Sequence, residues 1–521
     1  MSGRAIRAAG TRPPTHRAAI GLRLVLVVAI SVACQSSAPP PAALSPSPVA
    51  SAVPLGGVLR VDVATEPGSL DPLAASDPDA QLVMRQVYEG LVGLAPGAFS
   101  IVPVLATKWS ASADGRTWTF TLRDGVRFHD GTSLDADAAA SSLRRVSLPL
   151  AARVEASAPR TVTITTDRAY GPLLAQLALP SSAIASPSDR AAGTGPFAFV
   201  PSGWHRGSDL TVAANATYWQ RDAAGRPLPY LDAVTFQLRD ASAVRSSDLR
   251  TGAVHLATGL ASGDVAAIRS NPNLKAAFRP SDEVVYLGMD LRSAPFELVA
   301  VRRAIAAAFN PRSIVDRALP DGGTPASQLL VPELIGHDES TTVFARYDFD
   351  TAKRLLVEGG VAGGFATELW YAPPASANAI DTRRIAEALA ADLGRVGVIA
   401  TTRSTDARAL REGARSGRYP LWLDDHTLGL ADPQPLLDAA LGADSGWVNR
   451  PAQALLDAAR GEVDPSKRAE LYKQVSKLAQ QDVPRIPILY AATALGMSRK
   501  VRGLVPQPLG AESLATVSLE R

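Results

Sequence analysis

Apolar and polar residues alternate most clearly between residues 114 and 145. In segment 117–122 each threonine is followed by Trp, Phe or Leu, a period-two pattern that is typical of a strand with one buried face. The Asp124-Gly125 dipeptide favours a tight turn, after which segment 126–128 resumes the alternation, so the sequence predicts a β-hairpin. The residues after Ser133 are rich in alanine, with Asp135 and Asp137 near the front. This pattern predicts a helix start, because acidic residues are favourable at the positive end of a helix dipole.

The second half of the chain alternates strand patterns with helix patterns. Segment 367–371 is typical of a strand, and apolar residues recur from 385 to 396 at the spacing of one helix face. A later helix is predicted to turn Leu471, Val475 and Leu478 inward. Strands that alternate with helices along the chain predict an α/β fold.

Length and charge narrow the class of protein. The chain has 521 residues, and because one hydrophobic core stops growing near about 250 to 300 residues, we expect two lobes or more. Its 53 basic and 50 acidic residues nearly cancel, to a net charge of +3. No basic run is interleaved with aromatic residues, so nucleic acid is not expected as a partner.

The N-terminal segment predicts export. Arginines precede the apolar run 24–30, which is too short to span a bilayer, so residues 1–34 are interpreted as a signal peptide. Cys34, the single cysteine, ends a segment that resembles a bacterial lipobox, although Ser31 stands where such boxes usually have leucine. The resemblance implies acylation of Cys34, and an ordinary cysteine near a cleavage site is the alternative. Residues 35–55 are rich in Pro, Ser and Ala, which indicates an extended linker.

Several segments together resemble one known protein family. Residues 117–131 have the sequence TWTFTLRDGVRFHDG, and they stand in series with SLDP at 69–72, VYEGL at 87–91 and GTGPF at 193–197. In this order they resemble the family 5 extracellular solute-binding proteins, the oligopeptide- and dipeptide-type receptors of bacterial ABC importers. The resemblance extends from residue 57 to residue 490.

This resemblance implies a two-lobed α/β fold of the periplasmic-binding-protein (venus flytrap) type, with an additional subdomain in the first lobe. Segment 486–490 is expected to cross back to that lobe. The implied domains are lobe I over 56–95, 190–283 and 490–521, an inserted subdomain over 96–189, and lobe II over 284–489.

The resemblance also implies a function. The protein would capture a peptide or peptide-sized solute between its lobes and deliver it to the permease and ATPase subunits of an ABC importer, from the outer face of the cell membrane or the periplasm. We expect a lipid-anchored monomer without a cofactor and without enzymatic activity. The alternatives are an extracellular receptor or sensor for a non-peptide solute, and a secreted hydrolase. The chain has no HExxH, GxSxG or GxxxxGK motif, which disfavours catalysis.

Ligand contacts are expected around segment 421–433, where an aromatic ring, an imidazole and carboxylates lie close together in the sequence. A metal site is not expected there, because neighbouring residues on a strand point to opposite faces and no second histidine is nearby. The candidate ligand-binding residues are Trp422, Asp424, Asp425, His426, Asp432 and Tyr371.

In the family, an aspartate three residues after a tryptophan anchors the free amino group of bound peptides, and an Asp-Pro pair follows. A gapless alignment from Asp432-Pro433 places His426 at the tryptophan and Gly429 at the aspartate. We favour this alignment, which predicts no dependence on a peptide amino group and suits a hydroxyl-rich or anionic solute. An alignment with a four-residue insertion would place Trp422 and Asp425 on the motif instead.

Overall fold

The computed structural model describes residues 53–75, 77–340, 347–374, 380–510 and 512–521. The chain divides into two units, 1–52 and 53–521, and only the second contains described residues. The expected signal peptide, Cys34 and most of the expected linker therefore lie outside the described residues.

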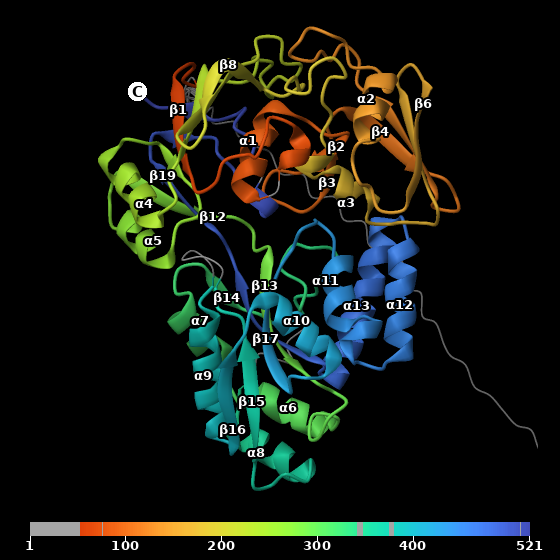
Figure 1. The fold of residues 1–521 in the computed structure, drawn as a ribbon, viewed down its shortest axis with the longest axis vertical. Helices are drawn as coiled ribbons and strands as arrows, with labels where there is room; N and C mark the ends of the chain where they lie inside the picture. Colours follow the sequence, from red (N-terminus) through yellow and green to blue (C-terminus); the bar gives the residue numbers. More distant parts are fainter. Residues whose placement is uncertain (1–52, 76, 341–346, 375–379, 511) are drawn as a thin grey trace, which may run out of the picture. The chain divides into compact units, whose positions relative to one another are not determined.

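A seven-stranded sheet surrounds the first strand of the described chain. In sheet order its strands are β12 (Leu274–Phe278), β19 (Ala494–Ser498), β11 (Leu256–Ala257), β1 (Val58–Val63), β10 (Ala233–Leu238), β9 (Asp209–Ala214) and β8 (Phe197–His205). β1 lies parallel to both β10 and β11, and its buried Leu59 and Val61 pack with Leu82 and Val83 of α1 (Pro78–Val87). Figure 1 shows that this sheet joins distant parts of the chain, since β19 (blue) and β1 (red) both belong to it.

A six-stranded sheet contains the predicted strand–helix alternation. In sheet order its strands are β14 (Gly323–Pro325), β18 (Arg485–Ala491), β13 (Glu283–Met289), β17 (Leu421–Thr427), β15 (Phe365–Tyr371) and β16 (Val398–Ser404). β15 is parallel to β16 and to β17. The connections between these parallel strands contain α9 (Thr382–Gly394) and α10 (Ala407–Ser416), so the predicted α/β fold is confirmed.

The pattern in residues 114–145 belongs to a four-stranded sheet, and the predicted hairpin there is wrong. The strands are β4 (Ala106–Ala111), β5 (Thr117–Leu122), β7 (Thr161–Thr166) and β6 (Ala151–Ala158). β5 is the predicted strand, but it pairs with β4 and β7, while Arg127 forms an isolated bridge with Ser133. Val126 and Phe128 are buried in the same core as β5, so their alternation signalled burial of a loop. The predicted helix is α2 (Ala136–Leu143), with Asp135 as its N-cap.

Further elements complete the described chain. Two short strand pairs are β2 (Val92–Leu94) with β3 (Ile101–Pro103) and β20 (Val501–Arg502) with β21 (Ser518–Leu519). Other α-helices are α3 (Leu173–Leu177), α4 (Ser242–Thr251), α5 (Ser262–Arg269), α6 (Val299–Ala307), α7 (Pro311–Ala318), α8 (Phe349–Glu358), α11 (Gln434–Leu441), α12 (Arg450–Gly461) and α13 (Pro465–Asp482). Short 3-10 helices are η1 (Pro72–Ala74), η2 (Pro180–Ser182), η3 (Ala443–Ser445) and η4 (Pro508–Gly510).

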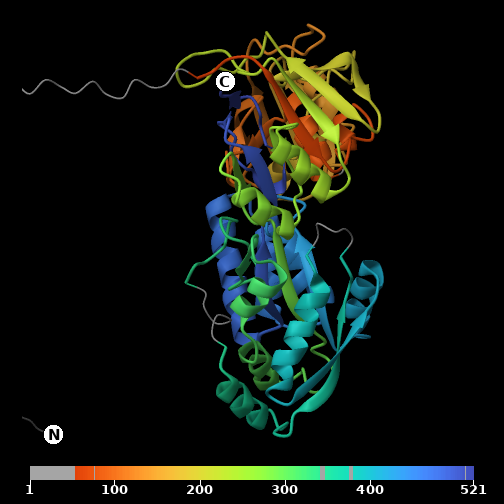
Figure 2. The same cartoon turned by 90° about the vertical axis from the view of Figure 1, so that its left-hand side faces the viewer.

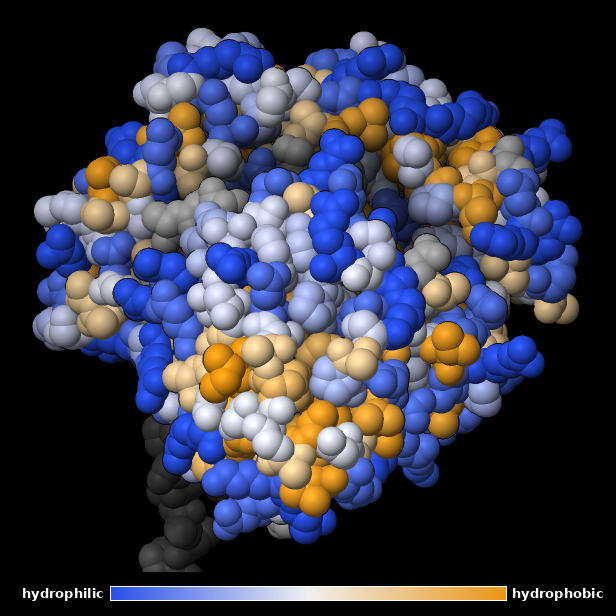
Figure 3. All heavy atoms as spheres, turned by 60° about the horizontal axis from the view of Figure 1, so that its bottom comes forward, coloured by the Kyte–Doolittle hydropathy of each residue, from blue (hydrophilic) through white to orange (hydrophobic). Residues whose placement is uncertain are grey.

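The surface of the described chain is of mixed polarity. Figure 3 turns the lower end of Figure 1 forward and shows apolar residues interspersed with polar ones. Exposed apolar side chains include Val357 of α8 and Ile399 of β16, and isolated apolar residues of this kind are normal on folded proteins. Within the described ranges, no helix combines the length and the apolar character that crossing a membrane requires.

The buried face of α13 is wider than predicted. Val475 is fully buried as expected, and Leu471 and Leu478 are half-buried against the same core. The helix also turns Arg468 and Tyr472 inward, because these two polar side chains find buried hydrogen-bond partners.

Two connections join the seven-stranded and six-stranded sheets. One runs from β12 to β13 and the other from β18 to β19, and Figure 2 shows the green and blue strands running side by side, in agreement with the pairing of β12 with β19 and of β13 with β18. Segment 486–490, which was expected to cross back, lies within β18 of the six-stranded sheet, because it stays paired with β13. The chain crosses to the seven-stranded sheet only afterwards, at Ala492 and Thr493 between β18 and β19. The lobe boundaries themselves stay a prediction.

Candidate functional site

Strand β17 presents the predicted residues on its two opposite faces. Trp422, Asp424 and His426 share one face, and Asp425 lies on the other, as the period of two in a strand requires. Trp422 lies opposite Gly288 of β13. A Cβ atom at Gly288 would come within 2.2 Å of the indole ring, so only glycine permits this close contact. The register thus fixes the position of the tryptophan.

A cleft of about 500 Å³ lies between residues of the two sheets. From the seven-stranded sheet it is lined by the residues after β1, by the start of α1 and by Phe278 at the end of β12. From the six-stranded sheet it is lined by Glu283 of β13 and by Asp425 and Thr427 of β17. Both connections between the sheets also border the cleft, at Arg279 and at residues 491–494. A group in this cleft would contact elements of both sheets.

Several charged groups of the cleft already have protein partners. Asp79 accepts hydrogen bonds from the backbone of residue 64 and from the hydroxyl of Thr258. Arg279 forms two hydrogen bonds with Glu512, at 2.6 and 2.9 Å. Asp321 pairs with an arginine of α5 at 2.5 Å. These groups are satisfied within the protein, and they hold the walls of the cleft.

Glu283 and Asp425 differ from these satisfied groups. In the described chain, neither carboxylate accepts a hydrogen bond from another residue, and neither forms an ion pair within 4 Å. Burial raises the pKa of Glu283 from 4.5 to about 8, and the negative charge of Asp425 adds to this rise. Burial, and then the charge of Asp424, also raises the pKa of Asp425. The cleft therefore contains two neighbouring acidic groups that form no ion pair with a described residue.

A second cavity, of about 380 Å³, lies between β17 and α10 and shares Asp425 and Thr427 with the cleft. Trp422 and His426 line it. Asp424 also lines it and accepts a hydrogen bond of 2.5 Å from the hydroxyl of Tyr286. Burial lowers the pKa of His426, so this imidazole is neutral near pH 7.

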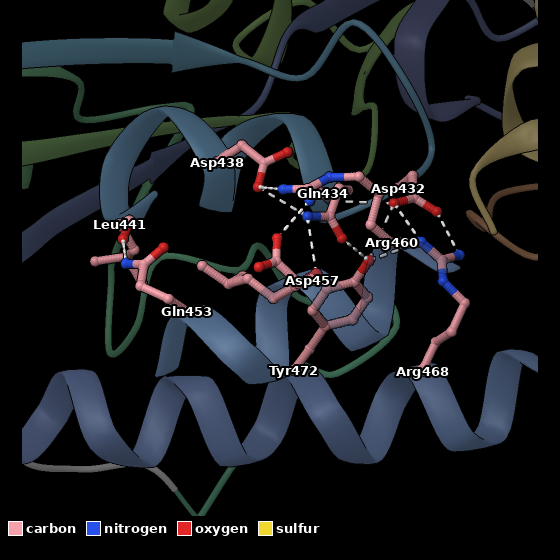
Figure 4. Close-up of polar contacts among 10 residues, drawn as sticks. Asp432, Gln434, Asp438, Leu441, Gln453, Asp457, Arg460, Arg468 and Tyr472 are labelled. Carbon is pink, nitrogen blue, oxygen red and sulfur yellow. Dashed lines mark hydrogen bonds and ion pairs between the residues drawn. The ribbon is translucent and has the colours of Figure 1, made fainter. Parts of the chain in front are cut away.

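The structure separates two of the six predicted residues from the other four. Asp432 is only 2% exposed, and its carboxylate pairs with the guanidinium of Arg468 at 2.7 and 2.8 Å, as Figure 4 shows. The Tyr472 hydroxyl and the backbone nitrogen of Gln434 add to this network. Tyr371 is buried in the core beneath the six-stranded sheet. Neither Asp432 nor Tyr371 lines the cleft or the second cavity.

Some residues that line the two cavities were missed in the sequence. Glu283 precedes the apolar core of β13 and resembles an ordinary polar strand end, and Arg485 resembles the polar residue after a helix. The pairing of β13 with β17 and β18 brings both next to the predicted residues, and a single sequence gives no sign of that order. Across the described ranges, no cluster of three or more His, Cys, Asp or Glu side chains is arranged to hold a metal ion.

Comparisons with known proteins agree with this architecture. Residues 100–447 match the bacterial extracellular solute-binding proteins, family 5 middle. The chain is 26% identical to heme-binding protein A of Haemophilus influenzae, over 84% of this chain and 87% of that protein. It is 27% identical to the dipeptide-binding protein of Escherichia coli, over 83% and 89%. The solved structure of HbpA2 from Haemophilus parasuis is similar with a TM-score of 0.82 and 26% identity, over 89% of this chain and all of that one.

Proposed function

Because this chain belongs to the family 5 bacterial extracellular solute-binding proteins, we propose that its cleft captures a short peptide, or a peptide-sized solute that carries a cationic amine. Proteins of this family are the solute-binding components of ABC importers, and they act outside the cytoplasm. The proposed mechanism is binding without turnover. The solute-loaded protein would then be recognised by a permease with its ATPase subunits.

The observation that carries this proposal is the pair Glu283 and Asp425. The negative charge of Asp425 acts on Glu283 in a partly buried cleft, and this repulsion contributes to the raised pKa of Glu283. Neither carboxyl group forms an ion pair with a described residue, and the charge of Arg411 acts on Asp425 only from outside ion-pair distance. A ligand ammonium group would remove this repulsion and would gain charge-assisted hydrogen bonds. The similarity to a dipeptide-binding protein supports a peptide as the source of that ammonium.

Capture would involve both sheets. The cleft is bordered by the connections at Arg279 and at residues 491–494, so a change of backbone angle in these short segments would open or close it. A solute that contacts both sheets binds the closed form better than the open form, and it therefore shifts the population toward closure. We propose that the permease recognises this closed form.

The lining of the cleft favours the alignment with an insertion over the gapless alignment. Gly429 is exposed after the end of β17, it has open space around its Cβ position, and it does not line the cleft or the second cavity. Asp425 lines both. We therefore propose Asp425 as the partner of the amino group, which reverses the specificity expected from the gapless alignment.

Calorimetry with alanyl-alanine and its N-acetyl form tests this function, because the two ligands differ in the ammonium group. We expect acetylation to weaken binding at least about 100-fold, since a buried charge left without its partner costs about 3 to 5 kcal/mol. Asp425→Asn should abolish this discrimination, whereas the exposed Glu412→Gln should retain it. Equal affinity of wild type for both forms, or unchanged discrimination in Asp425→Asn, would contradict the proposal.

We also propose that the protein is exported and held at the membrane as a monomer by acylation of Cys34. The apolar run before this single cysteine and the proline-rich residues after it support this proposal. One acyl chain gives only marginal attachment, so two or more would be needed. Membrane fractionation of cells that express Cys34→Ala should release the protein, and retention equal to that of wild type would refute the anchor.

A further inference from the structure

The second cavity carries more positive than negative charge. Arg411, Arg415 and Arg485 line it, against the carboxylates of Asp424 and Asp425. Arg485 is only 4% exposed. Since burial makes His426 neutral, this balance leaves room for one negative charge.

Arg485 is a buried cation without a paired carboxylate. Its guanidinium donates to the backbone carbonyls of Pro484 and Ser445, both at 2.7 Å. No ion pair within 4 Å joins it to a described acidic residue. Its carbon Cζ lies 5.0 Å from the ring centre of Trp422. The lining of the cavity therefore includes a flat indole and a guanidinium that forms no ion pair with a described carboxylate.

The two arginines of α10 differ from a third one on the same helix. Arg411 lines the cavity, and its positive charge acts on both Asp425 and His426. Neither Arg411 nor Arg415 forms a side-chain ion pair or hydrogen bond with another described residue. Arg408, in contrast, pairs with Glu412 at 2.8 Å on an exposed face. The cations without carboxylate partners are thus the ones that line the cavity.

We propose that this cavity is a subsite for a carboxylate carried on a flat or apolar part of the bound solute. The planar guanidinium donors of Arg411 and Arg415 match the two oxygens of a carboxylate, and the indole of Trp422 offers an apolar wall. The single unit of charge imbalance matches a carboxylate better than the dianion of phosphate. This inference rests on the proposed function, because the cavity shares Asp425 and Thr427 with the cleft. One solute would therefore place its amine and its carboxylate on opposite sides of Asp425.

Benzoate and benzamide are matched probes for this subsite, since they have the same ring and differ in charge. Ligand-observed NMR titration of the full chain should detect binding of benzoate at millimolar concentration. The protein should bind benzamide at least about tenfold more weakly. In Arg411→Gln/Arg415→Gln, benzoate binding should fall at least about tenfold, to the level of benzamide. The control Arg408→Gln lies on the same helix outside the cavity and should bind benzoate as wild type does.

Several results would overturn the subsite. They are an absence of benzoate binding to wild type, equal binding of benzamide, unchanged benzoate affinity in Arg411→Gln/Arg415→Gln, or displacement of benzoate by inorganic phosphate at a lower concentration than benzoate itself needs. Benzoate has no amine, so Asp425→Asn should not weaken its binding. Failure of the acetylation test with alanyl-alanine would therefore leave the benzoate result intact, and the two proposals can fail separately.

Discussion

Two groups of buried carboxylates in the same part of the chain have opposite surroundings. Asp432 has the guanidinium of Arg468 at 2.7 and 2.8 Å, with Tyr472 and Gln434 close by (Figure 4). Glu283 and Asp425 have no cation within 4 Å in the described chain. Asp432, whose partners are built into the fold, contributes to stability, whereas Glu283 and Asp425 lack such partners and line the cleft, where a ligand can reach them. Burial alone does not separate these roles, because all three side chains are at least partly buried.

The largest effect should come from breaking the satisfied pair. Arg468→Met leaves Asp432 buried without its cation, and we expect a loss of about 3 to 5 kcal/mol in the free energy of unfolding. Urea unfolding of the variant against wild type measures this loss. The double variant Arg468→Met/Asp432→Leu removes both charges and should recover part of the stability. A single variant as stable as wild type would mean that the pair in Figure 4 does not hold α11 to α13.

Ionisation of the unpaired Glu283 should lower the free energy of unfolding, whereas the ionised and paired Asp432 raises it. Its pKa in the folded protein is raised from 4.5 to about 8, so the folded state binds this proton more tightly than the unfolded state does. The resulting stability is fully present below pH 4.5 and is lost as the pH rises through 8.

Glu283→Gln removes this proton equilibrium. Between pH 4.5 and 8, wild type should lose about 2 kcal/mol more than the variant, and less than the full shift implies, because the side chain opens onto the cleft. Urea unfolding at a series of pH values without ligand measures the difference. The exposed Glu412→Gln should follow the wild-type curve, and parallel curves for Glu283→Gln and wild type would show that Glu283 titrates normally.

The sequence predicted the fold better than the site, and the contrast between Asp432 and the pair Glu283 and Asp425 explains why. Hydrophobic periodicity identified β5 and the alternation around β15, because burial of one face has a direct signature in the chain. The alanine-rich residues behind Asp135 identified α2. The same reasoning from periodicity placed Leu471 of α13 inward, where it packs half-buried against the core. It assigned Arg468 no role, since a charged residue on a helix is usually exposed. Asp432 was predicted as a ligand contact because an aromatic ring, an imidazole and other carboxylates lie near it in the sequence. Its actual partner, Arg468, lies 36 residues away. The packing of α13 gives Asp432 its cation, whereas the pairing of β13 with β17 brings Glu283 next to Asp425 without one.

A smaller effect on stability is expected for Asp424, which has a protein partner like Asp432 but also lines a cavity like Asp425. Tyr286→Phe removes the hydroxyl that donates to Asp424 at 2.5 Å, and we expect a loss of about 1 kcal/mol. The loss should be smaller than for Arg468, because Asp424 lines a cavity in which water can replace the hydroxyl. Urea unfolding measures it, with the exposed Tyr347→Phe as the matched control. A loss of 3 kcal/mol or more would mean that Asp424, like Asp432, depends on its protein partner for stability.

The smallest effect is expected for a pair with the same chemistry and nearly the same distance as Arg468 and Asp432. Arg408 and Glu412 are separated by 2.8 Å, but their side chains are 86% and 62% exposed. Water and salt screen such a pair, and two long side chains lose rotamer freedom when they hold one geometry, so the coupling should be about 0.5 kcal/mol or less. A double-mutant cycle with Arg408→Gln and Glu412→Gln, at low and high salt, measures it. A coupling above about 1 kcal/mol that survives high salt would mean that distance, more than burial, sets the strength of ion pairs in this protein.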